Sequence, residues 1–164
     1  MFEGFSEQIV SGEGAEIFVR HAGSSATPGL LLLHGYPQTS AMWHRMAPSL
    51  TSDYHVVCAD LRGYGRSGKP KSDEEHTPYS KRSMARDMIA VMKHFGHERF
   101  FVGAHDRGAR VAHRMVLDFE ASVDALVVLD IAPTREMYRD ADARFATAYW
   151  HWFFLTQQIG RAHV

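Results

Sequence analysis

The sequence contains only one cysteine, which excludes several classes of protein at once. Cys58 lies within the apolar run of residues 55–59, and a lone cysteine cannot form an internal disulfide, so nothing requires an oxidising compartment. We expect this cysteine to be a buried packing residue. The 11 histidines are scattered and show neither H-E-x-x-H nor paired-cysteine spacing. The sequence therefore predicts no metal site and no other cofactor.

Long hydrophobic runs and an excess of one charge are also missing. No stretch approaches the ~18 uninterrupted apolar residues of a membrane span. Residues 1–7 lack the basic start and apolar run of a secretory signal. The 18 basic residues against 19 acidic ones leave a formal charge of −1, which gives no reason to expect nucleic-acid or membrane-surface binding. We expect a cytoplasmic protein that acts on a small molecule.

Short apolar runs alternate with helical patterns along most of the chain. A hairpin is predicted from two strands, residues 5–10 and 15–21. Strands covered on both faces are predicted at residues 29–34, 55–59, 100–104 and 125–129. Helices are predicted within residues 40–50, 80–95 and 108–119. This alternation predicts an α/β fold, a three-layer sandwich with a mostly parallel sheet.

Ligands of such sheets bind beyond the carboxyl ends of the strands. Four polar residues follow predicted strands at that edge: His34, Asp60, Asp106 and Asp130. Residues 104–108 read small-x-Asp-x-Gly between a strand and a helix, which is the nucleophile-elbow pattern with aspartate in place of serine. On this spacing alone, Asp106 as a simple helix N-cap is an equal alternative. A serine esterase is disfavoured because the chain has no G-x-S-x-G.

Three further motifs occur in the order expected around such an elbow, and they favour the nucleophile over the cap. Residues 34–37 stand where hydrolases of this kind carry an oxyanion-hole loop, residues 60–67 read D-x-R-G-x-G-x-S, and residues 128–130 end the following strand in aspartate. Residues 63–68 also match G-x-G-x-x-G. A polar loop with Pro70 follows them instead of a helix, so nucleotide binding is rejected.

Residues 34–39, 42–44, 105–110, 129–134 and 151–154 resemble the fluoroacetate (haloacetate) dehalogenases of the α/β-hydrolase superfamily. The resemblance covers about residues 5–157. It implies that Asp106 is the nucleophile and that Arg107 and Arg110 bind the substrate carboxylate. A carboxylate is ionised at neutral pH, so it can displace a halide from carbon without a base and leave an ester on the enzyme. Two guanidiniums would offset the repulsion between two carboxylates.

The resemblance also assigns the remaining site residues. It implies that Asp130 orients the catalytic histidine, and it places His151 and Trp152 in the halide pocket. The backbone amides of Tyr36 and Arg107 would form the oxyanion hole. The enzymatic alternative is an epoxide hydrolase, which shares the aspartate nucleophile. It would need lid tyrosines, for which Tyr138 and Tyr149 make no strong case.

Members of the resembling family continue beyond the point where this sequence stops. We expect residues 1–134 to be the N-terminal part of the core, 135–157 the start of a helical lid, and 158–164 a non-native tail. The chain would then be truncated within the lid, before the last strands and the catalytic histidine. His105 is expected to point away from Asp106, and His113 lies on the next helix, so neither replaces that histidine. The alternative of another class is a non-catalytic fragment, and the resemblance makes a homodimer a candidate state of the full-length protein.

Overall fold

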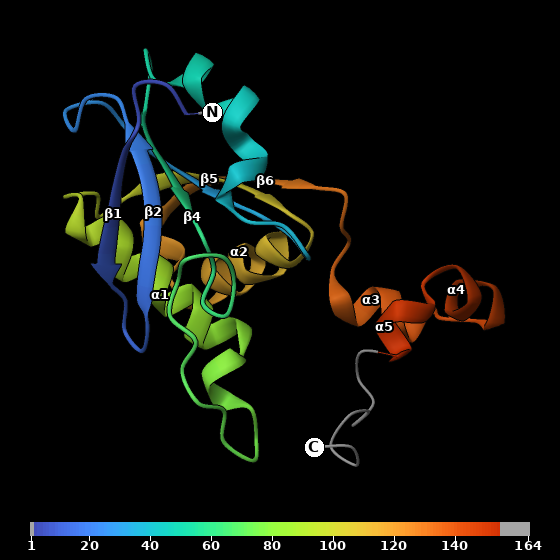
Figure 1. The fold of residues 1–164 in the computed structure, drawn as a ribbon. Coiled ribbons are helices and arrows are strands. Elements are labelled where there is room, and N and C mark those ends of the chain that lie inside the picture. The colour runs from blue at the N-terminus through green and yellow to red at the C-terminus, as the bar shows by residue number, and fades with distance from the viewer. Residues whose placement is uncertain (1, 155–164) are drawn as a thin grey trace. The chain divides into compact units, whose positions relative to one another are not determined.

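The computed structural model describes residues 2–154, and the chain divides into two compact units, Met1–Ile131 and Ala132–Val164. The first unit holds a six-stranded sheet in the order β1-β2-β4-β3-β5-β6 (Figure 1). Its strands are β1 (Ser6–Ser11), β2 (Glu16–Ala22), β3 (Gly29–Leu33), β4 (His55–Ala59), β5 (Phe100–His105) and β6 (Val123–Leu129). The hairpin β1-β2 is antiparallel, and the pairs β4-β3, β3-β5 and β5-β6 are parallel. The predicted α/β fold with a mostly parallel sheet is confirmed.

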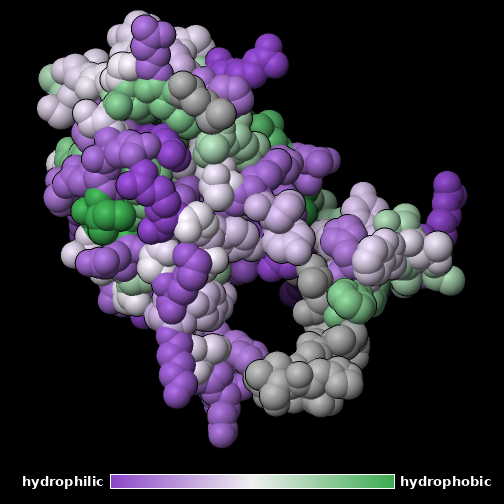
Figure 2. All heavy atoms as spheres, viewed as in Figure 1, coloured by the Kyte–Doolittle hydropathy of each residue, from purple (hydrophilic) through white to green (hydrophobic). Residues whose placement is uncertain are grey.

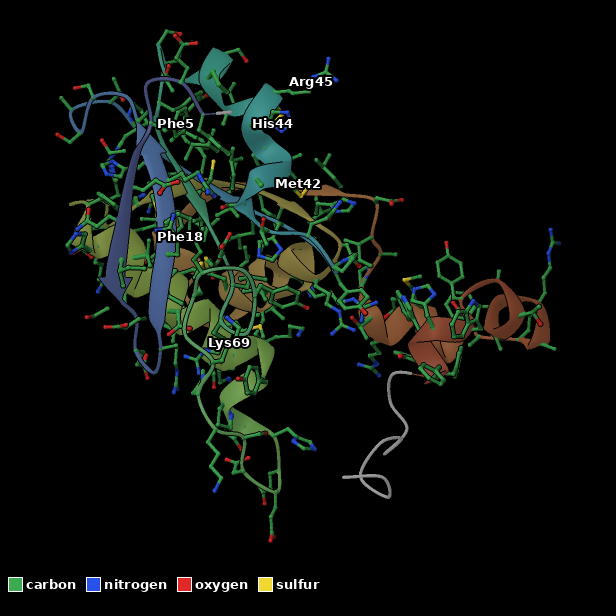
Figure 3. The ribbon with its side chains drawn as sticks, in the orientation of Figure 1. Phe5, Phe18, Met42, His44, Arg45 and Lys69 are labelled. Carbon is green, nitrogen blue, oxygen red and sulfur yellow. The ribbon has the colours of Figure 1, made fainter. Side chains whose placement is uncertain are left out.

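Helices cover both faces of this sheet, as a sandwich requires. The helices α1 (Lys81–His94) and α2 (Asp106–Asp118) pack on one face, where Leu31 and Leu33 of β3 point. Leu32 points to the other face and packs with Trp43 of the 3-10 helix η1 (Ser40–Arg45). Met42 and Phe5, both labelled in Figure 3, pack against this second cluster. The short 3-10 helices are η2 (Ala47–Leu50), η3 (Thr77–Tyr79) and η4 (Glu120–Ser122).

The prediction of one helix over residues 40–50 is wrong in detail. The segment forms two 3-10 helices that meet at Met46, because Pro48 stands in the first turn of η2 and has no N–H for a continuous α-helical ladder. The helix predicted from Gly108 begins instead at Asp106, directly after β5. The strand therefore runs into the helix without an intervening loop.

The D-x-R-G-x-G-x-S segment braces the loop that follows β4. The Asp60 carboxylate accepts hydrogen bonds from the Ser40 amide at 2.7 Å and from the Arg66 amide at 2.9 Å. The Ser67 hydroxyl donates to the Asp60 carbonyl at 2.6 Å and accepts from the Phe18 amide at 2.9 Å. A Cβ at Gly65 would clash with the Asp60 carboxylate, so only glycine fits there. This segment thus joins β2, β4 and η1, and Asp60 has a structural role.

β6 lies at an edge of the sheet and is poorly covered. Val127, Val128 and Leu129 are 58%, 46% and 41% exposed. An exposed apolar edge strand can pair with another chain. Hydrophilic residues dominate the face of the first unit drawn in Figure 2, with separate hydrophobic patches between them. None of the helices among residues 2–154 is long and apolar enough to cross a membrane.

The second unit contains three short helices, α3 (Thr134–Arg139), α4 (Ala143–Ala148) and α5 (Trp150–Phe154). Aromatic rings hold them together: Phe145 stacks on Tyr149 at 4.8 Å between ring centroids, and Trp152 lies 5.6 Å from Tyr138. The division at residues 134 and 157 into core, lid and tail stays a prediction. The proposed tail, 158–164, lies outside the described residues.

Three histidines form a chain of ring contacts near the start of β4. His55 Nε2 lies 3.3 Å from His21 Nδ1, and His55 Nδ1 lies 2.8 Å from His97 Nε2. Phe95 packs edge-on against His55. Burial, followed by the charges of His97 and His21, lowers the pKa of His55 to about 4. Burial also lowers the pKa of His21, with a contribution from His94, and that of His97. Burial therefore favours the neutral form of all three rings in the folded chain.

We expect acid to destabilise the fold through this cluster. The pKa of His55 lies below its ordinary value of 6.5, so the unfolded chain binds more protons between pH 6.5 and about 4. The contribution of the neutral His55 ring to the free energy of unfolding is fully present above pH 6.5. It falls as the pH drops toward 4, by on the order of 1 kcal/mol per pH unit. Urea unfolding at several pH values measures this slope. His55→Phe should flatten it, and an unchanged slope in that variant would contradict the assignment.

Candidate active site

The turn between β5 and α2 brings strand and helix unusually close. Asp106 is the first residue of α2 and has a φ of +44°, a left-handed conformation that few non-glycine residues adopt. A Cβ at Gly108 would lie 2.5 Å from the His34 carbonyl oxygen and 2.8 Å from the Leu33 Cβ, so only glycine fits. Ala104 is fully buried. These small residues let the turn place the Asp106 side chain at the carboxyl edge of the sheet.

The loop after β3 delivers a hydrogen-bond donor to this side chain. The backbone amide of Tyr36 donates to Asp106 Oδ2 at 2.9 Å. Gly35 allows the close approach, because a Cβ there would lie 2.7 Å from the Asp106 Cβ. The loop is turned back by a hydrogen bond from the Gln38 amide to the Gly35 carbonyl at 3.0 Å. This hydrogen bond fixes the position of Oδ2.

His34 holds the start of this loop and is not placed as an acid or base. Its Nε2 accepts from the Leu61 amide at 3.0 Å, and its Nδ1 donates to the Gly35 carbonyl at 2.8 Å. A neutral ring satisfies both contacts. Burial lowers the pKa of His34, which agrees with that neutral state. The ring also packs edge-on against Tyr64, and burial raises the pKa of the Tyr64 phenol.

Three cations lie near Asp106. Arg107 and Arg110 come from the first turns of α2, and the Arg107 guanidinium carbon lies 5.2 Å from the centroid of the Tyr36 ring. Lys81 begins the neighbouring helix α1 and is half-buried. Burial, followed by the charges of Arg107 and Arg110, lowers the pKa of Lys81 to about 8, while the Asp106 carboxylate acts in the opposite direction. The site therefore concentrates positive charge beside the Asp106 carboxylate.

Sequence reasoning missed Lys81, although a signal was present. Acidic side chains are favoured in the first turn of a helix, where the macrodipole is positive, and cations are disfavoured. A half-buried lysine at that position is therefore an electrostatic cost, which is a common mark of a site that holds an anion. The second signal, its closeness to Arg107 and Arg110, is visible only once α1 and α2 are packed together.

Asp130 follows β6 and lies beside the elbow. Its φ is +56°, and its side chain is 90% exposed. Its Oδ2 lies 3.7 Å from His105 Nε2. The His105 ring was expected to point away from Asp106. Its Nδ1 lies beside Gly35, which the Asp106 side chain also approaches, and its Nε2 faces Asp130. Among residues 2–154, no group of three or more histidine, cysteine, aspartate or glutamate side chains could hold a metal ion.

The remaining two predicted site residues lie in the second unit. His151 and Trp152 are neighbours on α5, and the Trp152 ring packs 5.7 Å from Tyr149 and 5.8 Å from Phe145. The first unit thus holds Asp106, the two arginines, the Tyr36 amide and Asp130, whereas the second unit holds both residues predicted for the halide pocket. The roles of His151 and Trp152 stay predictions.

Comparison with known proteins agrees with this geometry. A family model described as the alpha/beta hydrolase fold matches residues 28–160. A fluoroacetate dehalogenase from Burkholderia sp is 49% identical over 157 residues, covering 96% of this chain and 51% of that protein. A soluble epoxide hydrolase from Corynebacterium sp. is 38% identical over 104 residues, covering 63% of this chain and 35% of that protein.

The same holds for solved structures. An alpha/beta hydrolase from Nostoc sp superposes with a TM-score of 0.92 at 54% identity, covering 96% of this chain and 53% of that one. The chain spans about half the length of the dehalogenase that it matches. The resemblance to fluoroacetate dehalogenases seen in the motifs is confirmed. The chain belongs to the alpha/beta-hydrolase family.

Proposed function

We propose that this chain carries the nucleophile of a hydrolase that cleaves the carbon–halogen bond of small 2-haloacids such as haloacetates. One observation carries the proposal: the Asp106 carboxylate stands on a tight strand-to-helix turn with Oδ2 held by the Tyr36 amide. The cations Arg107, Arg110 and Lys81 lie near it. Because the chain spans about half of its dehalogenase relative, the activity of the whole protein is part of the proposal.

In the first step, Asp106 Oδ1 attacks the α-carbon of the haloacid. A carbon–oxygen bond forms, the carbon–halogen bond breaks, and the halide leaves with its electron pair. An ester links the enzyme to the substrate. Donors must face the departing halide, and we assign that role to the His151 ring and the Trp152 indole N–H. The Tyr36 amide supports the step by fixing the direction of the carboxylate.

In the second step, water attacks the ester carbonyl carbon, the bond between that carbon and Oδ1 breaks, and a 2-hydroxyacid leaves. Oδ2 then carries the developing negative charge, and it already lies 2.9 Å from the Tyr36 amide. The Arg107 amide is the second donor, since it lies in the first turn of α2, where N–H groups have no intrahelical acceptor. The catalytic histidine of the resembling family, which neither His105 nor His113 replaces and which Asp130 would orient, takes a proton from the water and passes it to the leaving oxygen.

The cations favour an acid as substrate over a neutral epoxide. A haloacetate carries its own carboxylate, which Asp106 repels, and three nearby cations offset that repulsion. An epoxide gains nothing from them. An epoxide hydrolase remains the second candidate because a soluble epoxide hydrolase is among the relatives. It shares the Asp106 step, so the choice of substrate separates the two functions.

The proposal is tested by incubating the 164-residue chain with bromoacetate, with its neutral analogue bromoacetamide, or with styrene oxide. Intact mass spectrometry and peptide mapping should find a bromoacetate-derived ester on Asp106, and halide release should accompany it. Cys58 will not compete, because burial raises the pKa of its thiol to about 12. An adduct on Asp106 from the epoxide alone would favour the second candidate. No adduct on Asp106 from any of the three would refute both.

We expect the arginines to decide between charged and neutral reagents. Arg107→Leu and Arg110→Leu should each slow ester formation with bromoacetate by about 10- to 100-fold, the loss of one charge-assisted hydrogen bond. Reaction with bromoacetamide should change far less. Arg86→Leu, at an exposed position on α1, is the control. Equal losses for both reagents would contradict carboxylate binding by these two residues.

Lys81 should make the reaction with the acid depend on pH. Its pKa of about 8 means that the ammonium is charged below pH 8 and is lost as the pH rises through that value. Ester formation with bromoacetate should therefore slow above about pH 8, whereas the reaction with bromoacetamide should not. Lys81→Met should show the slower rate at all pH values. A pH profile that persists unchanged in Lys81→Met would assign the titration to another group.

A further inference from the structure

His105 is a polar residue at the elbow that the proposed reaction does not use. It is the last residue of β5 and precedes the nucleophile, and its side chain makes no capping hydrogen bond to α2. Both ring nitrogens nevertheless face polar partners. Nδ1 lies 3.2 Å from Gln38 Oε1, and Nε2 lies 3.7 Å from Asp130 Oδ2. Helix capping therefore does not explain this side chain, whereas the two contacts connect three separate segments.

The contact with Gln38 reaches the loop that serves the nucleophile. Gln38 closes the turn over Tyr36, because its backbone amide donates a hydrogen bond to the Gly35 carbonyl. Gly35 of the same loop lies close to both His105 and Asp106. A Cβ at Gly35 would lie 2.8 Å from His105 Nδ1 and 2.9 Å from Asp106 Oδ2. The His105 ring and the Asp106 carboxylate thus both approach Gly35 on the side where a Cβ would project. Movement of this ring would displace the Tyr36 amide.

The contact with Asp130 reaches the end of β6. Asp130 has a largely exposed side chain and a left-handed backbone, so little else restrains its carboxylate. Both partners of the His105 ring are oxygen acceptors, the Gln38 amide oxygen and the Asp130 carboxylate. A ring that donates from Nδ1 holds Gln38, whereas the 3.7 Å between Nε2 and Asp130 Oδ2 is longer than a hydrogen bond and leaves an electrostatic contact.

We propose that His105 is a positioning residue that ties the Tyr36 loop to Asp130 and thereby fixes the Asp106 carboxylate for attack. The inference rests on the proposed function, since it acts through Asp106. His105 does not touch the substrate. It keeps the Tyr36 N–H directed at Asp106 Oδ2, and it links the loop that carries this N–H to Asp130 at the end of β6.

The test compares variants that keep or remove each contact. His105→Phe keeps a ring and removes both contacts. His105→Asn keeps a donor at the place of Nδ1, and Gln38→Leu removes the acceptor on the loop. The exposed His113 on α2 supplies the control variant, His113→Phe. Two quantities are measured in the 164-residue chain. One is the NMR resonance of the Tyr36 amide, and the other is the rate of ester formation on Asp106 with bromoacetate.

His105→Phe and Gln38→Leu should each shift the Tyr36 amide resonance and slow ester formation by about tenfold, as expected when a reacting group is misplaced. The double variant should be no slower than His105→Phe alone, because both substitutions remove the contact between His105 and Gln38. His105→Asn should restore the rate and the resonance. A merely structural role would lower the unfolding temperature without that rescue.

Two results would overturn the inference: an unmoved Tyr36 amide in His105→Phe, or losses that simply add in the double variant. If His105→Phe does not fold, His105→Asn is compared with Gln38→Leu instead. The inference then requires that Gln38→Leu shifts the Tyr36 amide resonance and slows ester formation, and that His105→Asn does neither. If the unsubstituted chain forms no ester on Asp106, the proposed function fails. The Tyr36 resonance still decides whether His105 positions the loop.

Discussion

Replacing Asp106 with asparagine should reduce ester formation with bromoacetate by at least about 1000-fold, as removal of a covalent nucleophile generally does. Asparagine has nearly the same shape and keeps an oxygen that can accept from the Tyr36 amide, so the loop and the turn should stay in place. What disappears is the ionised oxygen, Oδ1, that attacks the carbon. The three neighbouring cations would then bind bromoacetate without a reaction following.

The measurement is the rate at which intact mass spectrometry detects the ester. Asp53→Asn is the control. It removes a carboxylate that is exposed, follows η2 and is distant from Asp106 in the sequence, and it should leave that rate unchanged. The mass of the variant must also be followed with time, because deamidation of the introduced asparagine would regenerate aspartate. Ester formation at the original rate by an intact asparagine variant would remove Asp106 from the mechanism.

The elbow was predictable because its chemistry is local. Asp106 and Gly108 lie within five residues of Ala104, and the need for small residues there follows from the tight turn itself. The structure adds the cause, which is the approach of Gly108 to the backbone of His34 and Leu33. The sheet was predictable for a similar reason, since a strand buried on both faces is apolar at every position, as β3 and β4 largely are.

The features that sequence reasoning missed depend on contacts between distant residues. Lys81 is 25 residues from Asp106 in the sequence, and no local pattern joins the two helices that carry them. His105 looks like a spacer within the elbow motif until Gln38 and Asp130 are placed beside its ring. Periodicity alone also could not separate the two 3-10 helices around Met46 from one α-helix, because apolar residues recur at similar spacing in both.

Arg62, the arginine of the D-x-R-G-x-G-x-S segment, also makes contacts with distant residues that no local pattern predicts. These contacts give the largest expected effect on stability. Arg62 donates from Nε and Nη2 to the two carboxylate oxygens of Asp87, at 2.6 and 2.7 Å. Their side chains are 4% and 0% exposed. Arg62 also donates to the Pro78 carbonyl at 2.7 Å, and Asp87 accepts from the Gly14 amide at 3.2 Å. The pair therefore joins the loop after β4, the β1-β2 turn and α1.

Asp87→Leu should lower the free energy of unfolding by about 3–5 kcal/mol, because it leaves the Arg62 guanidinium buried without its counter-charge. The double variant Arg62→Met/Asp87→Leu should recover part of that loss, since it removes both charges from the interior. Urea unfolding of all three chains measures the difference. Asp124→Ala, which breaks the exposed pair with Arg99, is the control and should cost less than about 1 kcal/mol.

The cycle also distinguishes a charge effect from a packing effect. If the loss came from packing, the double variant would be less stable than Asp87→Leu, because a second side chain has been changed. If it comes from the unpaired guanidinium, the double variant must be the more stable of the two. The consequence for the site follows from α1: Asp87 lies on the helix that begins with Lys81. Loosening α1 should therefore weaken the reaction with bromoacetate more than the reaction with bromoacetamide, even though neither Arg62 nor Asp87 belongs to the proposed site.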